Sequence, residues 1–248
     1  MMPKIDTHVH SIASGHAFNT VDEIMGYANR KNLELVCITD HGPSMNGAPH
    51  AEYFEMVAEV PPIFNKCFCL MGCECNVIDH YGHIDLEDKF LRNLDILLVG
   101  LHKLTPYPEH SSEEKNTSAL IDAMKNPYVD IMAHPYKKDF PVNIEALVEA
   151  ASKYKCMLEL NCRIFSNTSD DRILIRTYEK MLKLCAEYRV YVVVGTDAHI
   201  KNKIGDFSSL YPLLKTINIY DEIIIKDARK FINTLQEKRE RRKFTGVL

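Results

Sequence analysis

Residues 4–41, KIDTHVHSIASGHAFNTVDEIMGYANRKNLELVCITDH, carry the pattern that decides the fold. Residues 4–10 and 33–41 have the β-branched, alternating character of strands. Between them, residues 19–31 repeat apolar side chains with the period of an amphipathic helix. A strand, a helix and a second strand in direct succession predict parallel strands joined by a covering helix.

The same alternation continues along the chain and gives seven strand candidates, six of them followed at once by a helix candidate. The strand candidates are residues 4–10, 33–41, 67–77, 94–102, 128–135, 156–162 and 191–199. Near-continuous apolar runs such as residues 191–195 suit parallel strands that are covered on both faces. Helix starts are expected at Asn19-Thr20, at Asn116-Thr117 and at Ser169 with Asp170 and Asp171. We therefore predict an α/β fold, a βα barrel with short connections.

Composition limits the classes of function. With 248 residues, 46% of them hydrophobic, the chain has enough apolar material for one sizeable core, so we expect one domain over residues 1–248. The net charge is −4 and basic residues are dispersed until the tail, which favours a small substrate over duplex nucleic acid. Without an apolar run of roughly 20 residues or a secretory pattern, the sequence predicts a cytoplasmic protein with no membrane partner.

The eight cysteines do not indicate a disulfide scaffold in a chain of this length. Two C-x-C pairs, Cys67/Cys69 and Cys73/Cys75, place both sulfurs on one side of a strand, where they could bind metal. Zinc sites normally use wider cysteine spacing, so we favour core packing.

The strand candidates share one further property, since nearly all of them end in a residue type that binds metals. These residues are His8, His10, His41, Glu74, His102, His134, Asp197 and His199, and strand six ends at Asn161. The carboxyl ends of all strands lie on one face of a parallel barrel, so side chains distant in sequence should converge there. The sequence therefore predicts a pocket rich in metal ligands.

A single histidine at a strand end is usually structural, so the joint pattern carries the prediction. Seven of the 11 histidines belong to it once His16, in the following loop, is included. Imidazole suits zinc, iron or manganese, and Glu74 could bridge two ions. Asp6 and Asp40 could orient ligating imidazoles, or simply form turn hydrogen bonds. The remaining histidines, for which solvated or capping roles are expected, are His50, His80, His83 and His110.

Six motifs in this order, DTHVHS, ITDHG, GCECN, GLH, AHP and GTDAH, resemble the PHP (polymerase and histidinol phosphatase) superfamily. The resemblance extends over essentially the whole chain, and residues 7–24 with 38–50 look closest to the YcdX-type phosphatases. It implies a distorted barrel of seven βα units, in agreement with the strand count above.

The resemblance also implies which residues hold metal. The first ion would match His8, His10, Glu74 and Asp197, the second Glu74, His102 and His134, and the third His16, His41 and His199. The implied activity is that of a metal-dependent phosphoesterase acting on a small phosphate monoester. It would use three divalent ions, zinc in the first place and manganese or iron as alternatives, with Glu74 and Asp197 as catalytic residues.

Substrate contacts are expected from residues near the strand ends. Arg163, Lys103 and Lys137 are the nearest cations, and Asn161 offers hydrogen bonds. Arg163, like His83, departs from the YcdX-type pattern, so the substrate stays open. Hydrolysis of histidinol phosphate or of a nucleotide phosphate is an alternative, as is a non-catalytic metal-binding module. The sequence leaves the oligomeric state open.

Overall fold

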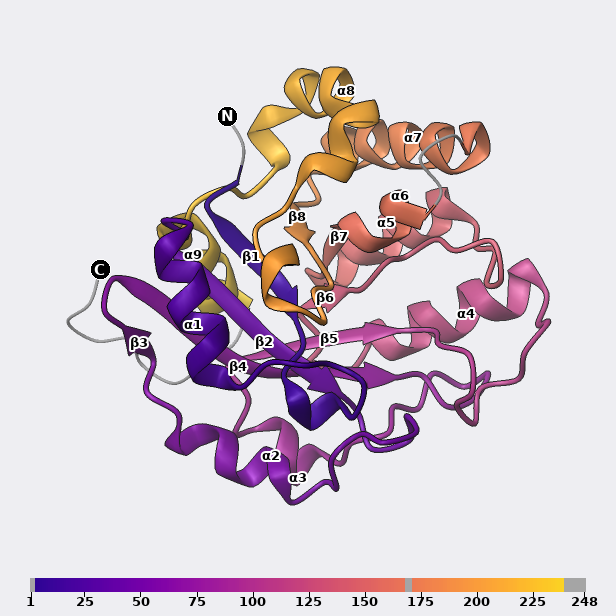
Figure 1. The fold of residues 1–248 in the computed structure, drawn as a ribbon. Helices are drawn as coiled ribbons and strands as arrows, with labels where there is room; N and C mark the ends of the chain where they lie inside the picture. The colour runs from indigo at the N-terminus through magenta and orange to yellow at the C-terminus, as the bar shows by residue number, and fades with distance from the viewer. Residues whose placement is uncertain (1–2, 168–170, 239–248) are drawn as a thin grey trace.

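The computed structural model describes residues 3–167 and 171–238. Seven parallel strands form one strongly curved sheet in the order β1-β2-β4-β5-β6-β7-β8 (Figure 1). These strands are β1 (Ile5–Val9), β2 (Leu35–His41), β4 (Cys67–Asn76), β5 (Ile96–Gly100), β6 (Ile131–Met132), β7 (Met157–Asn161) and β8 (Val192–Gly195). The predicted parallel strands are confirmed.

The two edges of the sheet meet between β1 and the residues that follow β8. A parallel bridge joins Val9 to Ala198. The amide of Asp197 donates to the carbonyl of His8 (2.8 Å), and the amide of His10 donates to the carbonyl of Ala198 (3.0 Å). Because β6 has only two residues and closure rests on these few bonds, the barrel is irregular. The expected distorted (β/α)7 barrel is confirmed.

An eighth strand, β3 (Ile63–Phe64), pairs antiparallel with the start of β4 and was not predicted. Two residues are too few to show an alternating pattern in sequence.

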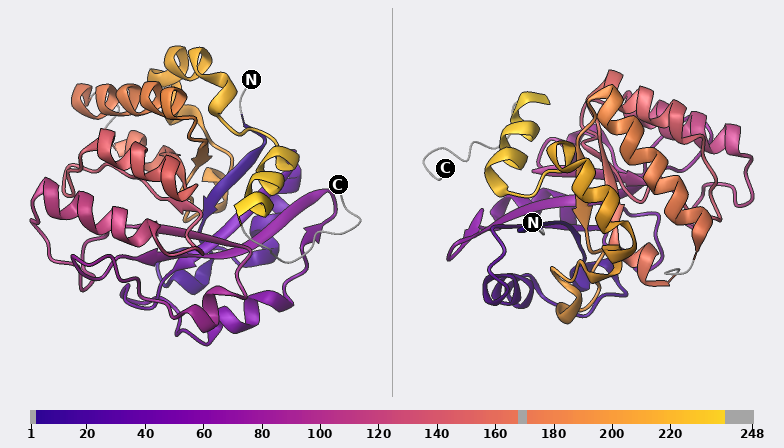
Figure 2. Two further views of the ribbon diagram at one scale, coloured as in Figure 1. Left: turned by 180° about the vertical axis from the view of Figure 1, so that it is seen from behind. Right: turned by 90° about the horizontal axis from the view of Figure 1, so that it is seen from above.

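Helices surround the strands, as Figures 1 and 2 show. They are α1 (Val21–Arg30), α2 (Tyr53–Met56), α3 (Asp88–Leu91), α4 (Glu113–Met124), α5 (Ile144–Tyr154), α6 (Cys162–Asn167), α7 (Arg172–Tyr188), α8 (Leu214–Ile219) and α9 (Ala228–Lys238). Short 3-10 turns are η1 (Ile12–Ser14), η2 (Val57–Glu59), η3 (Lys201–Lys203), η4 (Ser208–Leu213) and η5 (Asp221–Ile223). No helix in the described ranges is long and apolar enough to cross a membrane.

The helix starts test the sequence analysis in detail. The start of α1 is confirmed, because Thr20 and Glu23 form a reciprocal capping box. The predicted start of α4 at Asn116-Thr117 is wrong, since Ser112 caps the helix one turn earlier. Asn116 is buried instead and bonds to the hydroxyl of Tyr107 (2.8 Å).

The start of α7 is tested only in part. Asp171 caps this helix by accepting from the amides of Ile173 and Leu174. The other two residues of that predicted start, Ser169 and Asp170, lie outside the described residues.

The prediction of short connections is wrong after β1, β2, β4, β5 and β6, each of which is separated from the next α-helix by 11 or 12 residues. Residues 77–87 separate β4 from the single turn α3, and residues 101–112 separate β5 from α4. The second of these loops contains His102 and Lys103, which line a cavity at the strand ends. Long loops that carry binding residues commonly occur at this end of a barrel.

The interior of the barrel is an apolar core distinct from the core beneath the outer helices. Its inward-facing residues are Ile5, Leu35, Cys37, Leu70, Ile96, Leu98, Ile131, Ala133, Met157 and Val193. Helix α9 packs against this layer through Ala228, Phe231, Ile232 and Leu235. The left view of Figure 2 shows α9, in yellow, lying over the strands. The helix therefore covers the interior of the barrel.

All eight cysteines are buried and unpaired. Cys73 and Cys75 do place their sulfurs together, 3.4 Å apart, but within the outer core. Burial raises the pKa of Cys67, Cys69 and both of these thiols, which keeps them in the thiol form that binds metal poorly. The preference for core packing is confirmed.

Candidate metal centre

The structure brings all nine predicted ligands together at the carboxyl ends of the strands. They are His8, His10, His16, His41, Glu74, His102, His134, Asp197 and His199. Most of them line a cavity of about 200 Å³ that opens to solvent. Parallel strands produce this convergence, because each presents its last residues on the same face of the barrel.

Glu74, on strand β4, is the middle of the cluster, with its side chain 1% exposed. Its Oε1 lies 2.7 Å from His134 Nε2 and 3.0 Å from His102 Nε2. Its Oε2 lies 2.9 Å from His41 Nδ1 and 3.3 Å from His8 Nε2. One carboxylate thus faces imidazoles at the ends of four other strands.

Asp197 occupies the other side of the cluster, just after β8. Its Oδ1 lies 3.3 Å from His10 Nε2 and 3.4 Å from His199 Nδ1. The ring of His16 stacks on those of His41 and His199, with centroids 4.9 and 4.8 Å apart. The loop histidine therefore joins the strand-end histidines.

The candidate ligands form three sets, and within each set the ligand atoms lie within 4.8 Å of one another. The sets are His8, His10 and Asp197; His41, Glu74 and His102; and His10, His41 and His199. They overlap the three groups implied by the family resemblance without reproducing them. His10 and His41 each belong to two sets, while His16 and His134 flank the sets through the contacts given above.

The protonation states suit a cation. Burial opposes ionisation of Glu74, but the neighbouring His8, His102 and His41 hold its pKa well below the usual range. Burial lowers the pKa of His102 to about 3 and that of His199 to about 4, so both imidazoles are neutral. His8 differs, because the carboxylates of Glu74 and Glu159 raise its pKa in spite of its burial, and a bound metal would displace a proton from this ring. Ionised carboxylate with neutral imidazole is the form in which these groups bind metal.

Several ligand atoms have no hydrogen bond although they are buried. Among the described residues these include His41 Nδ1 and Glu74 Oε2, which lie 2.9 Å apart without hydrogen-bond geometry. Unsatisfied buried polar atoms are costly and rare in native proteins. Lone pairs directed at the same space are what a bound cation would satisfy, so these residues fit a divalent metal.

Two candidate ligands have strained backbones. His134 and Asp197 have φ angles of 31° and 53°, in the region that side chains disfavour. Such conformations cost on the order of 1–3 kcal/mol and cluster at functional sites. The ring of His134 also needs Gly100, because a Cβ there would lie 2.6 Å from His134 Cε1.

Asp40 and Asp6, predicted as possible orienting residues, have different environments. Asp40 Oδ1 accepts from Ser14 Oγ (2.6 Å), which lies 3.0 Å from His10 Nδ1, so Asp40 supports an imidazole through a serine. Asp6 accepts from the amide and the hydroxyl of Thr196 (2.9 and 2.6 Å) and supports the backbone where β1 meets β8.

Glu159 on β7 is a site residue that the sequence analysis missed. Its side chain is fully buried, with Oε1 2.7 Å from His8 Nδ1, while Oε2 accepts from the amide of His134 (2.6 Å). The sequence contained a signal, because Glu159 interrupts an apolar strand two residues before Asn161 and so shares its face.

The predicted substrate-binding residues fall in different places. Arg163, Lys103 and Lys137 line the cavity, and Arg163 Nη1 lies 2.5 Å from His199 Nδ1. Asn161 is fully buried behind the cavity, where it donates to Glu159 (3.1 Å) and Asp197 (3.3 Å). This placement supports a positioning role for Asn161 better than direct contact with substrate.

The remaining histidines do not contribute to the three ligand sets. His83 pairs with Asp79 (2.7 Å) on the surface, and His80 contacts Ser111 (2.8 Å). These contacts agree with the solvated or capping roles expected for them.

Comparison with known proteins identifies the family. The PHP domain matches residues 6–192. The chain belongs to the PHP domain family. This PHP protein is 42% identical over 242 residues to a protein named a probable phosphatase from Caldanaerobacter subterraneus subsp. tengcongensis, covering 96% of this chain and 92% of the relative. It is 35% identical to a probable phosphatase from Acetivibrio thermocellus, covering 96% and 97%.

A solved structure confirms the fold. The histidinol phosphate phosphatase of Lactococcus lactis, complexed with zinc, L-histidinol and phosphate, superposes with a TM-score of 0.63 at 18% identity. The match covers 89% of this PHP protein and 94% of that chain. The predicted PHP resemblance and barrel are therefore confirmed.

Proposed function

We propose that this PHP protein is a metal-dependent phosphatase that hydrolyses a small phosphate monoester. The observation that carries the proposal is the cluster around Glu74, in which imidazoles and ionised carboxylates converge at the base of a cavity. Two relatives whose alignments cover 96% of this chain are named probable phosphatases, and they support the same reaction class.

We assign the nine ligands to three divalent ions, with zinc as the first choice and manganese or iron as alternatives. Glu74 would bridge two ions, because its two oxygens face imidazoles on opposite sides. Asp197 would hold an ion together with His8 and His10. Bound ions would polarise the phosphate oxygens and lower the pKa of the attacking water.

The side chains at the mouth of the cavity suit the substrate. Arg163, Lys103 and Lys137 line the cavity and can bind the phosphoryl oxygens. A volume of about 200 Å³ is below the roughly 300–1,000 Å³ of most ligand pockets, which supports a small substrate. We propose that Asn161 keeps the carboxylate of Asp197 in place through its 3.3 Å hydrogen bond.

Two further proposals concern the whole chain. We propose that residues 1–248 form one PHP domain, which the single outer core from Val9 to Ile224 supports. We also propose a cytoplasmic enzyme, which the eight unpaired cysteines support, because thiols stay reduced there.

The test is phosphate release by protein freed of metal with a chelator and then resupplied with zinc, manganese or iron. The panel contains sugar phosphates, histidinol phosphate, nucleoside 5′-monophosphates and one phosphodiester as a control. We expect monoester hydrolysis to require added metal and to accompany close to three bound ions per chain. One ion or none would contradict the trinuclear assignment, and metal binding without hydrolysis would indicate a non-catalytic module.

A further inference from the structure

The carboxylate of Glu159 contacts two candidate ligands that come from different strands. Glu159 Oε1 lies 2.7 Å from His8 Nδ1, and Glu159 Oε2 accepts from the backbone amide of His134 (2.6 Å) and from Asn161 Nδ2 (3.1 Å). The side chain has no exposed surface. It lies behind the cluster, and the cavity lining does not include it.

The environment of Glu159 is built for close approach. Gly195 on the neighbouring strand β8 has no side chain, and a Cβ there would lie 2.1 Å from Glu159 Oε1 and 2.5 Å from His8 Cβ. Only glycine at this position lets the carboxylate and the imidazole meet. His134, held by the other oxygen, is the residue with the strained φ of 31°.

The hydrogen-bond donors around Glu159 determine which kind of side chain can occupy this position. The amide of His134 and the Nδ2 group of Asn161 both donate, so Oε2 must accept. If Oε1 also accepts, His8 carries a proton on Nδ1, and an ion bound at Nε2 would take the place of any proton there, next to Glu74 Oε2 at 3.3 Å. Among side chains of this size, only an ionised carboxylate can accept hydrogen bonds on both of its terminal atoms.

We infer that Glu159 is a positioning residue of the metal centre, which fixes His8 as an Nε2 ligand and holds His134 in its strained conformation. The inference rests on the proposed function, because it concerns the metal site. His8 and His134 face opposite oxygens of Glu74, so one buried carboxylate sets ligands on both sides of the proposed bridge.

The experiment compares wild type with Glu159→Gln, which keeps the size of the side chain. The amide can accept on one side only, so either the His8 proton moves to Nε2 or the donors of His134 and Asn161 meet an NH2 group. Loss of an orienting partner typically weakens metal binding roughly 10- to 100-fold. We expect Glu159→Gln to lose zinc affinity by that factor, as measured by competition with a chromogenic chelator.

Asp130→Asn provides the matched control. Asp130 is another fully buried carboxylate, at the start of β6, where it accepts from the amide of Leu97 (2.9 Å) at the other end of the barrel. This variant should lower the melting temperature of the metal-free protein and leave zinc affinity within about twofold of wild type. If Glu159→Gln behaves in the same way, its role is structural only and the inference is overturned.

A measurement on wild type covers the case in which Glu159→Gln does not fold. Nitrogen-15 NMR of the zinc-loaded protein assigns the tautomer of His8, using His8→Gln to identify its signals. A proton on Nδ1 is expected, and a proton on Nε2 would overturn the inference. Failure of the proposed function is distinguishable, because wild type itself would then bind no zinc or would release no phosphate from the panel.

Discussion

The two ends of the barrel differ in the partners of their buried carboxylates. At the carboxyl end, Glu74 and Asp197 each face imidazoles from more than one strand. At the amino end, Asp95 and Asp130 accept from the amides of neighbouring strands, and α9 covers an apolar interior. One end is arranged to receive a ligand, and the other is arranged to hold the barrel together.

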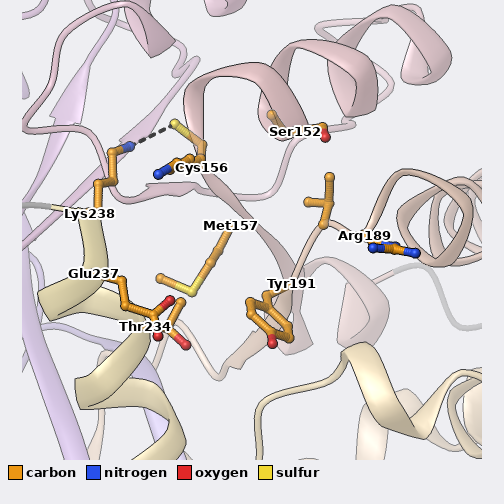
Figure 3. A pocket seen from close by; sticks show the side chains of 11 residues that line it. Ser152, Cys156, Met157, Arg189, Tyr191, Thr234, Glu237 and Lys238 are labelled. Atoms are coloured by element: carbon orange, nitrogen blue, oxygen red, sulfur yellow. Dashed lines mark hydrogen bonds between the residues drawn. The ribbon is translucent and has the colours of Figure 1, made fainter.

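Cavities at the two ends show the same contrast. A second cavity, of about 190 Å³, lies beside the start of β7 and the end of α9. Figure 3 shows Cys156, Met157 and Tyr191 around it, with Lys238 reaching Cys156 (3.2 Å). None of the three ligand sets found among the described residues includes a residue of this cavity. Similar volumes therefore do not imply similar chemistry.

Phe231→Ala tests the amino end and should have the largest effect on stability. Phe231 is fully buried between α9 and the barrel interior, and removing such a ring typically costs about 3–5 kcal/mol. The free energy of unfolding in urea should fall by that amount, while kcat per folded molecule and metal content stay unchanged. A matching loss of kcat in the folded fraction would show that the two ends are not independent.

Glu74→Gln tests the carboxyl end. Metal ions contribute several kcal/mol to catalysis, so loss of the bridging carboxylate should lower kcat roughly 100- to 1,000-fold and loosen two ions together. Metal analysis and phosphate release measure both effects. His16→Ala, which removes a ring stacked at the edge of the cluster, should cost much less. Full turnover and full metal content in Glu74→Gln would refute the bridge.

Arg163→Ala tests the rim of the cavity, where effects should be smaller. A charge-assisted hydrogen bond to phosphate is typically worth about 1.5–3 kcal/mol, so KM should rise roughly tenfold or more with kcat nearly unchanged. Lys103→Ala is the comparison and should matter less, because Lys103 pairs with Asp139 at 2.7 Å, whereas the ion pair between Arg163 and Asp197 is longer, at 3.9 Å. If KM and kcat both stay at wild-type values, Arg163 belongs to the solvated surface.

Asp6 lies where the barrel closes. Its substitution should have the smallest effect on the free energy of unfolding, and that effect should depend on pH. Burial raises its pKa from 3.8 to about 6. The folded state therefore binds this proton more tightly, so the contribution to stability is full below about pH 4 and is lost as the pH rises through 6.

The pH dependence of the Asp6 contribution to stability can be measured by comparing wild type with Asp6→Asn, both in the metal-free form. The stability of wild type relative to this variant should be greater at pH 5 than at pH 7.5 by roughly 1.4 kcal/mol. Urea unfolding at the two pH values measures it. A difference that does not change with pH would mean that Asp6 titrates alike in the folded and unfolded states.

The sequence by itself predicted the parallel strands and the convergence of the nine candidate ligands. Residue types recur at strand ends with a period that the backbone imposes, and parallel strands place those ends together. It also located Arg163 and Lys103 near the cavity. It failed at the start of α4, because Asn116-Thr117 looks like a cap until tertiary contacts bury Asn116.

Only the tertiary structure decided which candidate ligands lie close enough to share an ion and what supports them. Glu159 and His8 are 151 residues apart, and their contact exists because the barrel closes and Gly195 leaves room. Ser14, the link between Asp40 and His10, lies on a short turn with no pattern of its own. Local sequence sets strand period and helix caps, whereas contacts across the barrel depend on register and closure, which no short segment encodes.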